Sequence, residues 1–414
     1  MRKTVVALIV VLLALALLPA ATPATGLQSA CIFYRWPTAA LAAAEFPWLV
    51  QHYQFFDCGS TDAYRSQLRS MTTAPMVRYA NVSNVDVAGN TPEWQAMQRW
   101  CTATGVPIER MFLHAANPYT FKAVTYPAGN RLCCFWPNRF VLNVAAPEVQ
   151  AWCEYAGAEM KARMYPLYSG IFVDNGWFRV PLLDIGLPVA TGTKEGLTDA
   201  QWLAGLAECI KAVKRGAGGG LTIINTGNYS VPATSTLVAA ADGWLGELWI
   251  RPLREFVDAQ VLLVRARDLA GKISILHARL DVIDSDPDRG KILALALYYV
   301  CSGEHTYLFA GENYGGKPYP ALNWYGALDV DIGKPLGEPY KVAGQPVIVW
   351  ARVFTGGLVI AKPLPRYNSM YTDSTLVPLP AGTWRAVHAD GTLGNPVSGT
   401  ITLRNAEGAV LVSN

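Results

Sequence analysis

The stretch GIFVDNGW, at residues 170–177, is an apolar run that passes directly into a carboxylate, an amide and an indole. Ile171 to Val173 have the β-branched and aromatic character of a buried strand, and Asp174 follows at once. Turn chemistry alone would account for this ending, because Asp, Asn and Gly favour the turn that ends a strand. In a parallel barrel, however, an aspartate at the carboxyl end of a strand is typical of a catalytic group. The rest of the chain decides between these interpretations.

Eight short apolar runs of this kind alternate with helix-like segments along the chain. The runs are ACIFYRW (30–36), HYQFFDC (52–58), MVRYANV (76–82), GIFVDN (170–175), LTIINTGN (221–228), GWLGELWI (243–250), KISILHAR (272–279) and HTYLFAG (305–311). Strands that alternate with helices indicate a parallel sheet in an α/β fold. Eight such repeats predict a (β/α)₈ TIM barrel.

Residues 83–169 interrupt the barrel pattern, since they are too many for one helix between the third and fourth strands. We interpret them as a large excursion with structure of its own. Two runs inside it, MFLH (111–114) and RFVLNV (139–144), are alternatives for a barrel strand and would shift the strand count by one.

The two ends of the chain differ from the barrel. Residues 1–26 combine Arg2 and Lys3 with an apolar run and small residues, which predicts a secretory signal peptide. Such a protein is secreted or extracytoplasmic, with no stable membrane insertion after cleavage; an uncleaved anchor is the alternative. The barrel domain then spans 27–340. Alternating runs separated by turn residues predict a small antiparallel β-sandwich over 341–414.

The composition excludes several classes of protein. Of the 414 residues 51% are hydrophobic and 16% charged, and the net charge is only +3, which argues against a nucleic-acid partner. No cofactor is implied, because GAGGG (216–220) lacks the Lys-Ser/Thr of a phosphate-binding loop. We expect no metal site, since His114 and His277 stand alone and no CxxC occurs.

The eight cysteines permit disulfides in an exported chain. Cys31 starts the first strand and Cys301 precedes the eighth, so both should lie at the amino end of neighbouring strands. We therefore predict a Cys31–Cys301 bridge, whereas Cys58 ends the second strand and should lie far from Cys31.

Polar and aromatic side chains collect at the predicted strand ends. Amides and arginines can bind hydroxyl groups and indoles can stack on a sugar ring, so this set suits a carbohydrate. The substrate-binding candidates are Tyr34, Trp36, Asp57, Arg78, Tyr79, Asn175, Trp177, Asn225, Asn228, Trp249, His277 and Arg279.

Two carboxylates among the strand ends form the best catalytic pair. Glycoside cleavage needs two carboxyl groups that flank the bond. Asp174 ends the fourth strand and Glu247 lies in the sixth, so both can face one opening; Asp174 would be the nucleophile and Glu247 the acid/base. The alternatives are a turn or helix cap for Asp174 and an ion pair with Arg251 or Arg279 for Glu247.

GIFVDN, INTGN and DGWLGELW, with LDVDIGKPLGEPY and VWARVFTGGLVIAKP further on, resemble a group of hypothetical glycoside hydrolases. That group is similar to the α-galactosidase/α-glucosidase-like barrels and to endo-α-1,4-polygalactosaminidases. The resemblance implies a barrel followed by a β-sandwich, with the nucleophile after strand four and the acid/base after strand six, that is, Asp174 and Glu247. One departure, Lys362-Pro363 where the group usually has Asn-Pro, bears on packing rather than on activity.

These observations predict a secreted glycoside hydrolase that cleaves a poly- or oligosaccharide, with retention of configuration. The alternative is a non-catalytic carbohydrate-binding protein on a barrel scaffold. The sequence leaves the sugar, the linkage and the oligomeric state open.

Overall fold

The structure is a computed structural model. It describes residues 26–32, 39–57, 65–164, 166–227, 234–247, 254–279, 286–311, 324–366, 369–370 and 372–414. Only Gly26 of the predicted signal segment 1–26 belongs to these ranges.

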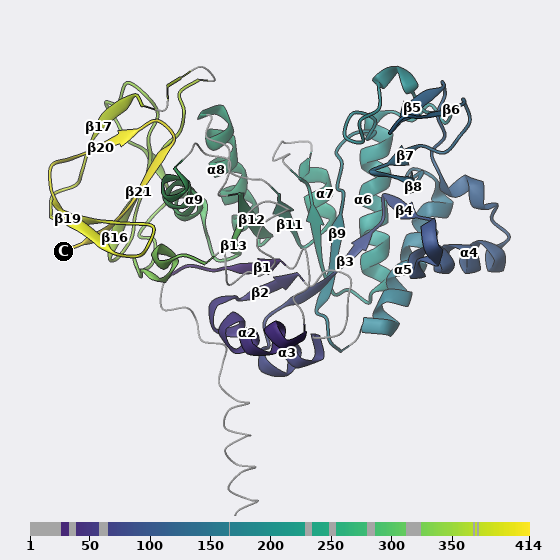
Figure 1. The fold of residues 1–414 in the computed structure, drawn as a ribbon, viewed down its shortest axis with the longest axis horizontal. Helices are drawn as coiled ribbons and strands as arrows, with labels where there is room; N and C mark the ends of the chain where they lie inside the picture. The colour runs from purple at the N-terminus through teal and green to yellow at the C-terminus, as the bar shows by residue number, and fades with distance from the viewer. Residues whose placement is uncertain are drawn as a thin grey trace, which may run out of the picture. The chain divides into compact units, whose positions relative to one another are not determined.

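The largest sheet has eight strands in the order β1-β2-β3-β9-β10-β11-β12-β13. Their bounds are Ala30–Ile32 (β1), Phe55–Asp57 (β2), Met76–Asn81 (β3), Gly170–Asp174 (β9), Leu221–Asn225 (β10), Gly243–Gly246 (β11), Ile273–Arg279 (β12) and Thr306–Gly311 (β13). A parallel bridge between Ser29, just before β1, and Leu308 of β13 links the first and last strands of the sheet. Figure 1 labels both strands. All eight predicted runs are therefore barrel strands, and the predicted TIM-barrel class is confirmed.

Helices alternate with the barrel strands as the sequence predicts, except that α4 and α5 both lie between β3 and β9. They are α2 (Ala39–His52), α3 (Arg65–Met71), α4 (Pro92–Thr104), α5 (Pro147–Met164), α6 (Asp199–Gly216), α7 (Ser235–Ala240), α8 (Arg254–Leu269) and α9 (Pro287–Cys301). Thr198 begins α6 with a capping box, in which its hydroxyl and the Gln201 side chain each accept a backbone N–H. Gly157 in α5 allows a close approach of α6, because a Cβ there would lie 2.3 Å from the Val213 carbonyl oxygen.

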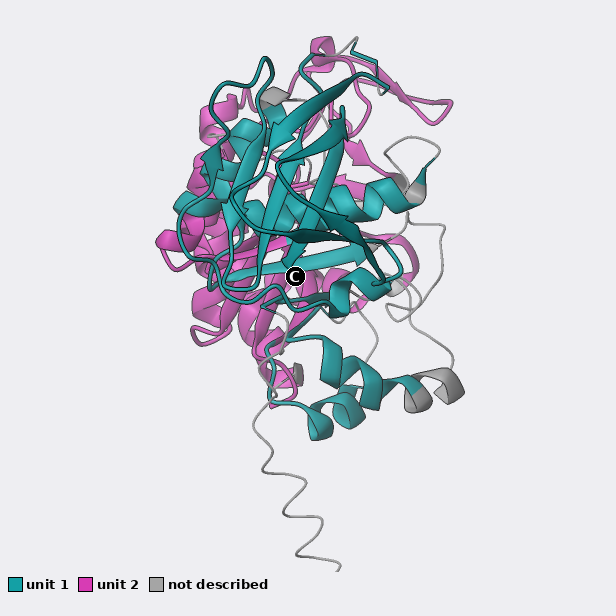
Figure 2. Ribbon diagram, turned by 90° about the vertical axis from the view of Figure 1, so that its left-hand side faces the viewer, with its two compact units in different colours: residues 1–75, 250–266, 276–414 teal, residues 76–249, 267–275 magenta. Residues whose placement is uncertain are grey.

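The chain divides into two compact units, which Figure 2 shows in different colours. Unit 2 comprises residues 76–249 and 267–275, and unit 1 the remainder. Unit 2 holds β3, β9, β10 and β11 together with the excursion, and unit 1 holds β1, β2, β13 and the C-terminal strands.

The excursion has a fold of its own within unit 2. It forms a three-stranded antiparallel sheet of order β4-β8-β7 and a hairpin of β5 and β6. Their bounds are Asn84–Asp86 (β4), Tyr119–Phe121 (β5), Val124–Tyr126 (β6), Cys133–Cys134 (β7) and Trp136–Val141 (β8). The idea that MFLH or RFVLNV is a barrel strand is therefore wrong: Phe140 in RFVLNV pairs antiparallel with Val85, just after β3.

The C-terminal part of unit 1 is a β-sandwich, as predicted. A six-stranded sheet of order β14-β15-β16-β21-β18-β19 accompanies a β17-β20 pair. The bounds are Tyr340–Lys341 (β14), Trp350–Val353 (β15), Gly357–Lys362 (β16), Ser374–Pro378 (β17), Trp384–Val387 (β18), Leu393–Val397 (β19), Thr400–Arg404 (β20) and Glu407–Ser413 (β21). Its core includes Leu358 and Leu411 from the larger sheet and Val377 and Leu403 from the pair.

The predicted Cys31–Cys301 disulfide is wrong, because none of the seven cysteines among the described residues is bridged. Cys301 belongs to the last turn of α9, and its thiol donates back to the Leu297 carbonyl at 3.0 Å on the same helix. The place of Cys301 shortly before the eighth strand therefore did not determine where its thiol points, because the residue belongs to a helix. Cys58 lies outside the described residues.

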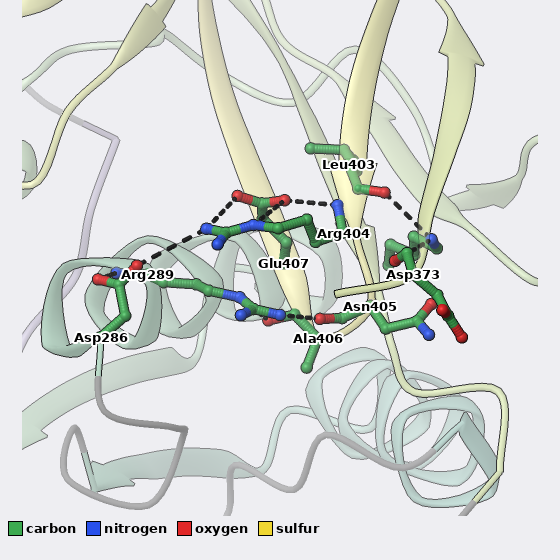
Figure 3. A network of polar contacts seen from close by, with 9 residues as sticks. Asp286, Arg289, Asp373, Leu403, Arg404, Asn405, Ala406 and Glu407 are labelled. Carbon is green, nitrogen blue, oxygen red and sulfur yellow. Dashed lines mark hydrogen bonds and ion pairs between the residues drawn. The ribbon is translucent and has the colours of Figure 1, made fainter. Parts of the chain in front are cut away.

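Lys362, the departure noted in the sequence, is buried at the end of β16. Its ammonium donates to the carbonyl oxygens of Leu403, at 3.1 Å, and Asp373, at 3.5 Å. Figure 3 shows the surrounding network, in which the Arg289 guanidinium of α9 reaches the carbonyl oxygens of Asn405 and Ala406. The Lys362 ammonium thus belongs to the packing of unit 1.

The Lys362→Met variant should reveal how the buried charge of Lys362 contributes to the stability of the protein. Burial lowers the pKa of the Lys362 ammonium below the ordinary 10.5. The folded protein therefore loses this proton at a lower pH than the unfolded chain does, and its stability rises with pH within that interval. Urea unfolding from pH 7 upward should show the wild type gaining stability relative to the variant as the pH approaches 10.5. Parallel stability curves for the two proteins would contradict this.

Candidate active site

Three neighbouring strands of unit 2 end in the polar residues that build the site. Asp174 ends β9 and pairs with Asn81, the last residue of β3. Asn225 ends β10 and pairs with Leu245 of β11, and Glu247 follows two positions later. Side chains two positions apart on a strand point to the same face. Parallel strands present their carboxyl ends at one edge, so these side chains converge there.

Asp174 is held by three hydrogen-bond donors. Its Oδ2 accepts from the Tyr79 hydroxyl at 2.9 Å and from Asn175 Nδ2 at 3.1 Å. Its Oδ1 accepts from Asn225 Nδ2 at 2.8 Å. Three donors on two oxygens fix the orientation of the carboxyl group. The carboxyl group is therefore held by side chains from β3, from β10 and from the turn after β9.

Asn225 joins Asp174 to Glu247. Its Nδ2 donates to Glu247 Oε2 at 3.0 Å as well as to Asp174 Oδ1 at 2.8 Å. Because one nitrogen contacts both oxygens, these two atoms can be no farther apart than the sum of the two distances, 5.8 Å. The Asn225 Oδ1 accepts the Gly227 N–H at 2.8 Å, which fixes the orientation of the amide. The two predicted catalytic carboxylates thus come together.

The geometry of the turn after Asp174 explains why Asn and Gly occupy positions 175 and 176. Asn175 has φ +61°, in the left-handed region that Asn tolerates better than most residues. The Gly176 N–H donates to the Asn225 carbonyl at 2.7 Å, and a Cβ on Gly176 would lie 2.6 Å from that oxygen. The turn and the carboxylate that contacts Asn225 are therefore both present in the same stretch.

Trp177, a predicted stacking platform, lies in a buried aromatic cluster. It is 8% exposed, and its ring centroid lies 5.7 Å from that of Phe135 and 6.4 Å from that of Trp202. Its carbonyl accepts the Trp202 indole N–H at 2.8 Å. These contacts give it a packing role in unit 2.

Arg139 is a residue of the site that the sequence reasoning missed. It comes from β8 of the excursion, and its Nη2 lies 3.4 Å from the Tyr79 hydroxyl. Its Nε donates to Asn84 Oδ1 of β4 at 2.5 Å. Burial first, and then the charge of Asp174, raise the pKa of Tyr79, while Arg139 opposes the rise. Tyr79 therefore stays protonated and keeps the hydrogen that it donates to Asp174.

The other candidates have different positions. Arg78 precedes Tyr79 on β3, so its side chain leaves from the opposite face of the strand. Asp57 and His277 belong to unit 1; Asp57 is buried at the end of β2, and His277 is buried with its ring 4.8 Å from that of Phe309. Tyr34, Trp36, Asn228, Trp249 and the side chain of Arg279 lie outside the described residues.

Two further properties concern the described ranges only. No cluster of three or more His, Cys, Asp or Glu side chains in them could hold a metal ion. None of their helices combines the length and the apolar character that crossing a bilayer requires.

Residues 124–358 match the profile of hypothetical glycosyl hydrolase family 15, and this region contains Arg139, Asp174, Asn225 and Glu247. The chain belongs to hypothetical glycosyl hydrolase family 15. The sequence resemblance to hypothetical glycoside hydrolases is therefore confirmed. No curated protein matches the chain. A member of hypothetical glycosyl hydrolase family 15 is a glycoside hydrolase, and its substrate is a carbohydrate.

Solved structures support the fold of this family 15 member. Amy13B of Eubacterium rectale is 9% identical, with 95% of this chain and 97% of that chain covered and a TM-score of 0.54. A GH27 β-L-arabinopyranosidase from Geobacillus stearothermophilus, in complex with arabinose, is also 9% identical, with 94% and 97% covered and a TM-score of 0.52. At these identities the likeness concerns the fold alone.

Asn225→Ala should reduce kcat by about 10²–10³-fold in this family 15 hydrolase, the usual effect of removing one donor from a preorganised site. Both carboxylates lose a shared donor, so their mutual orientation is no longer fixed. The measurement is the release of reducing ends, with Asn117→Ala as the matched control, since the exposed Asn117 amide donates to the Ala190 carbonyl and contacts neither carboxylate among the described residues. Equal activity of Asn225→Ala and wild type would contradict the bridging role.

Proposed function

We propose that the protein is a secreted, retaining glycoside hydrolase in which Asp174 is the nucleophile and Glu247 the acid/base. The observation that carries this proposal is the shared Asn225 nitrogen, which limits the Asp174 Oδ1 to Glu247 Oε2 distance to 5.8 Å. Retaining enzymes have carboxyl groups about 5–5.5 Å apart, whereas inverting enzymes need about 6.5–9.5 Å to accommodate a water molecule. The limit supports retention.

The hydrogen bonds of Asp174 favour Oδ1 as the attacking oxygen. A carboxylate oxygen can accept about two hydrogen bonds. Oδ2 accepts two, from Tyr79 and Asn175, whereas among the described residues Oδ1 accepts one, from Asn225. A lone pair of Oδ1 is therefore left to attack, on the side of Asp174 that faces Glu247 through Asn225.

The reaction then has two balanced steps. Asp174 Oδ1 bonds to the anomeric carbon while the glycosidic bond breaks, and the leaving oxygen takes a proton from Glu247. Water next bonds to the anomeric carbon, its proton returns to Glu247, and the electron pair of the ester bond returns to Asp174. The first step therefore requires Glu247 to carry the proton that the leaving oxygen takes.

The non-catalytic alternative lacks support from this geometry. A binding protein that lost catalysis would be favoured if Glu247 pointed away from Asp174 or lay beyond about 10 Å. Both carboxylates instead share one donor.

Asp174→Asn and Glu247→Gln test the two roles on a panel of soluble polysaccharides and 2,4-dinitrophenyl glycosides. Asp174→Asn should abolish turnover of every compound that wild type cleaves. Glu247→Gln should lose about 10²–10⁴-fold on polysaccharides but far less on the dinitrophenyl compounds, which need no acid. Glu154→Gln, which removes an exposed carboxylate paired with Arg215, is the matched control.

The anomer formed first, observed by ¹H NMR, tests the stereochemistry. The same anomeric configuration in substrate and product is expected. Inversion, or full activity in Asp174→Asn, would overturn the proposed mechanism.

Export is supported by the pattern of residues 1–26, with cleavage expected near residues 24–26. Amino-terminal sequencing of the protein recovered outside the cytoplasm should therefore begin within a few residues of Gly26. An intact Met1 on that protein would contradict cleavage.

A further inference from the structure

We propose that Arg139 is a positioning residue for the nucleophile and acts on Asp174 through the Tyr79 hydroxyl. This inference rests on the proposed function, because it gives a role to a residue only if Asp174 is the nucleophile. It adds the excursion to the catalytic machinery, since Arg139 lies on β8 and not on a barrel strand.

The contacts around the Tyr79 hydroxyl leave one direction for its hydrogen. A phenol has one donor and two acceptor sites. Arg139 Nη2 approaches the oxygen at 3.4 Å and Asn81 Nδ2 at 3.5 Å, and both groups can only donate. The Tyr79 hydrogen therefore points to Asp174 Oδ2, 2.9 Å away.

Arg139 itself is held in place and charged. Its Nε donates to Asn84 Oδ1 at 2.5 Å, and its guanidinium carbon lies 5.8 Å from the Phe135 ring centroid. Burial opposes the charge, but the hydrogen bond to Tyr79 and the electrostatic interactions with Tyr79, Cys134 and Asp174 outweigh this effect and raise the pKa of Arg139. A fixed positive charge therefore polarises the phenol toward the carboxylate.

The charge on Asp174 changes during the reaction, so Arg139 should affect the two steps unequally. Asp174 is an uncharged ester in the intermediate and regains its charge when water displaces it. Polarised donors on Oδ2 stabilise that returning charge. Without Arg139, the departing carboxylate is less stable and the second step slows more than the first.

Arg139→Gln, Tyr79→Phe and the double variant test this on a dinitrophenyl glycoside that wild type cleaves. In Arg139→Gln, kcat should fall about 10- to 100-fold, the effect of removing an outer partner of a catalytic group. KM should fall with it, and glycosyl-enzyme should accumulate in intact-mass spectra. A partly misfolded sample would lower kcat with KM unchanged.

The double variant and the controls complete the test. If Arg139 acts through Tyr79, Arg139→Gln should have little further effect in the Tyr79→Phe background. Arg139→Lys should recover part of kcat, because it keeps the charge without the planar fork. Arg110→Gln, which removes an exposed excursion arginine paired with Glu148, should match wild type.

The outcomes separate this inference from the proposed function. If Asp174→Asn is inactive and Arg139→Gln has wild-type kcat and KM, the inference fails and the nucleophile assignment stands. Additive effects of Arg139→Gln and Tyr79→Phe would likewise overturn the action through Tyr79. If Asp174→Asn is active, the proposed function fails and this inference fails with it.

Discussion

The amide nitrogen of Asn225 is the contact on which the site depends. Two carboxylate oxygens within 5.8 Å of each other repel by about 3 kcal/mol at an effective dielectric constant of about 20, if both are charged. An amide NH₂ carries two hydrogens, so it can direct one to each carboxylate. The Gly227 N–H on the other end of the amide determines which atom faces the acids. The end of β10 thereby sets the spacing of two groups from β9 and β11.

The backbone reinforces this side-chain contact. Gly176 donates its N–H to the Asn225 carbonyl, so the turn after Asp174 is tied to the end of β10 by main-chain atoms too. The left-handed Asn175 between them makes the sharp change of direction possible. Since a Cβ on Gly176 would collide with the same carbonyl, the sequence Asp-Asn-Gly meets three separate demands at consecutive positions. Asp174 and the end of β10 are consequently linked by a side-chain and a main-chain hydrogen bond.

The sequence could predict the barrel and the two acids because both follow local rules. Alternating runs reveal strands, and parallel strands bring their carboxyl ends to one edge, which identified Asp174, Asn225 and Glu247. Arg139 has no such sequence signal, because the antiparallel pairing of β8 with β4 brings it to Tyr79. The pairing of β8 with β7 is also irregular, since its register shifts between Cys133 and Cys134. Register inside an irregular insertion is a tertiary property. The predicted Cys31–Cys301 disulfide was wrong for a related reason. The order of strands along the chain says nothing about where the side chain of Cys301 points, because this residue lies in helix α9.

The point at which the excursion leaves the barrel explains how it can reach the nucleophile. Asn81, the last residue of β3, accepts the backbone N–H groups of Ser83 and Asn84, each at 3.2 Å, and so shapes the turn into β4. Asn84 then holds Arg139, while Asn81 itself contacts the Tyr79 hydroxyl. One turn thus governs both approaches to Tyr79. The β5-β6 hairpin forms a separate sheet, and the Tyr119 hydroxyl of β5 accepts the Cys133 N–H of β7 at 3.1 Å. The excursion is therefore anchored to the barrel through the residues that contact the Tyr79 hydroxyl.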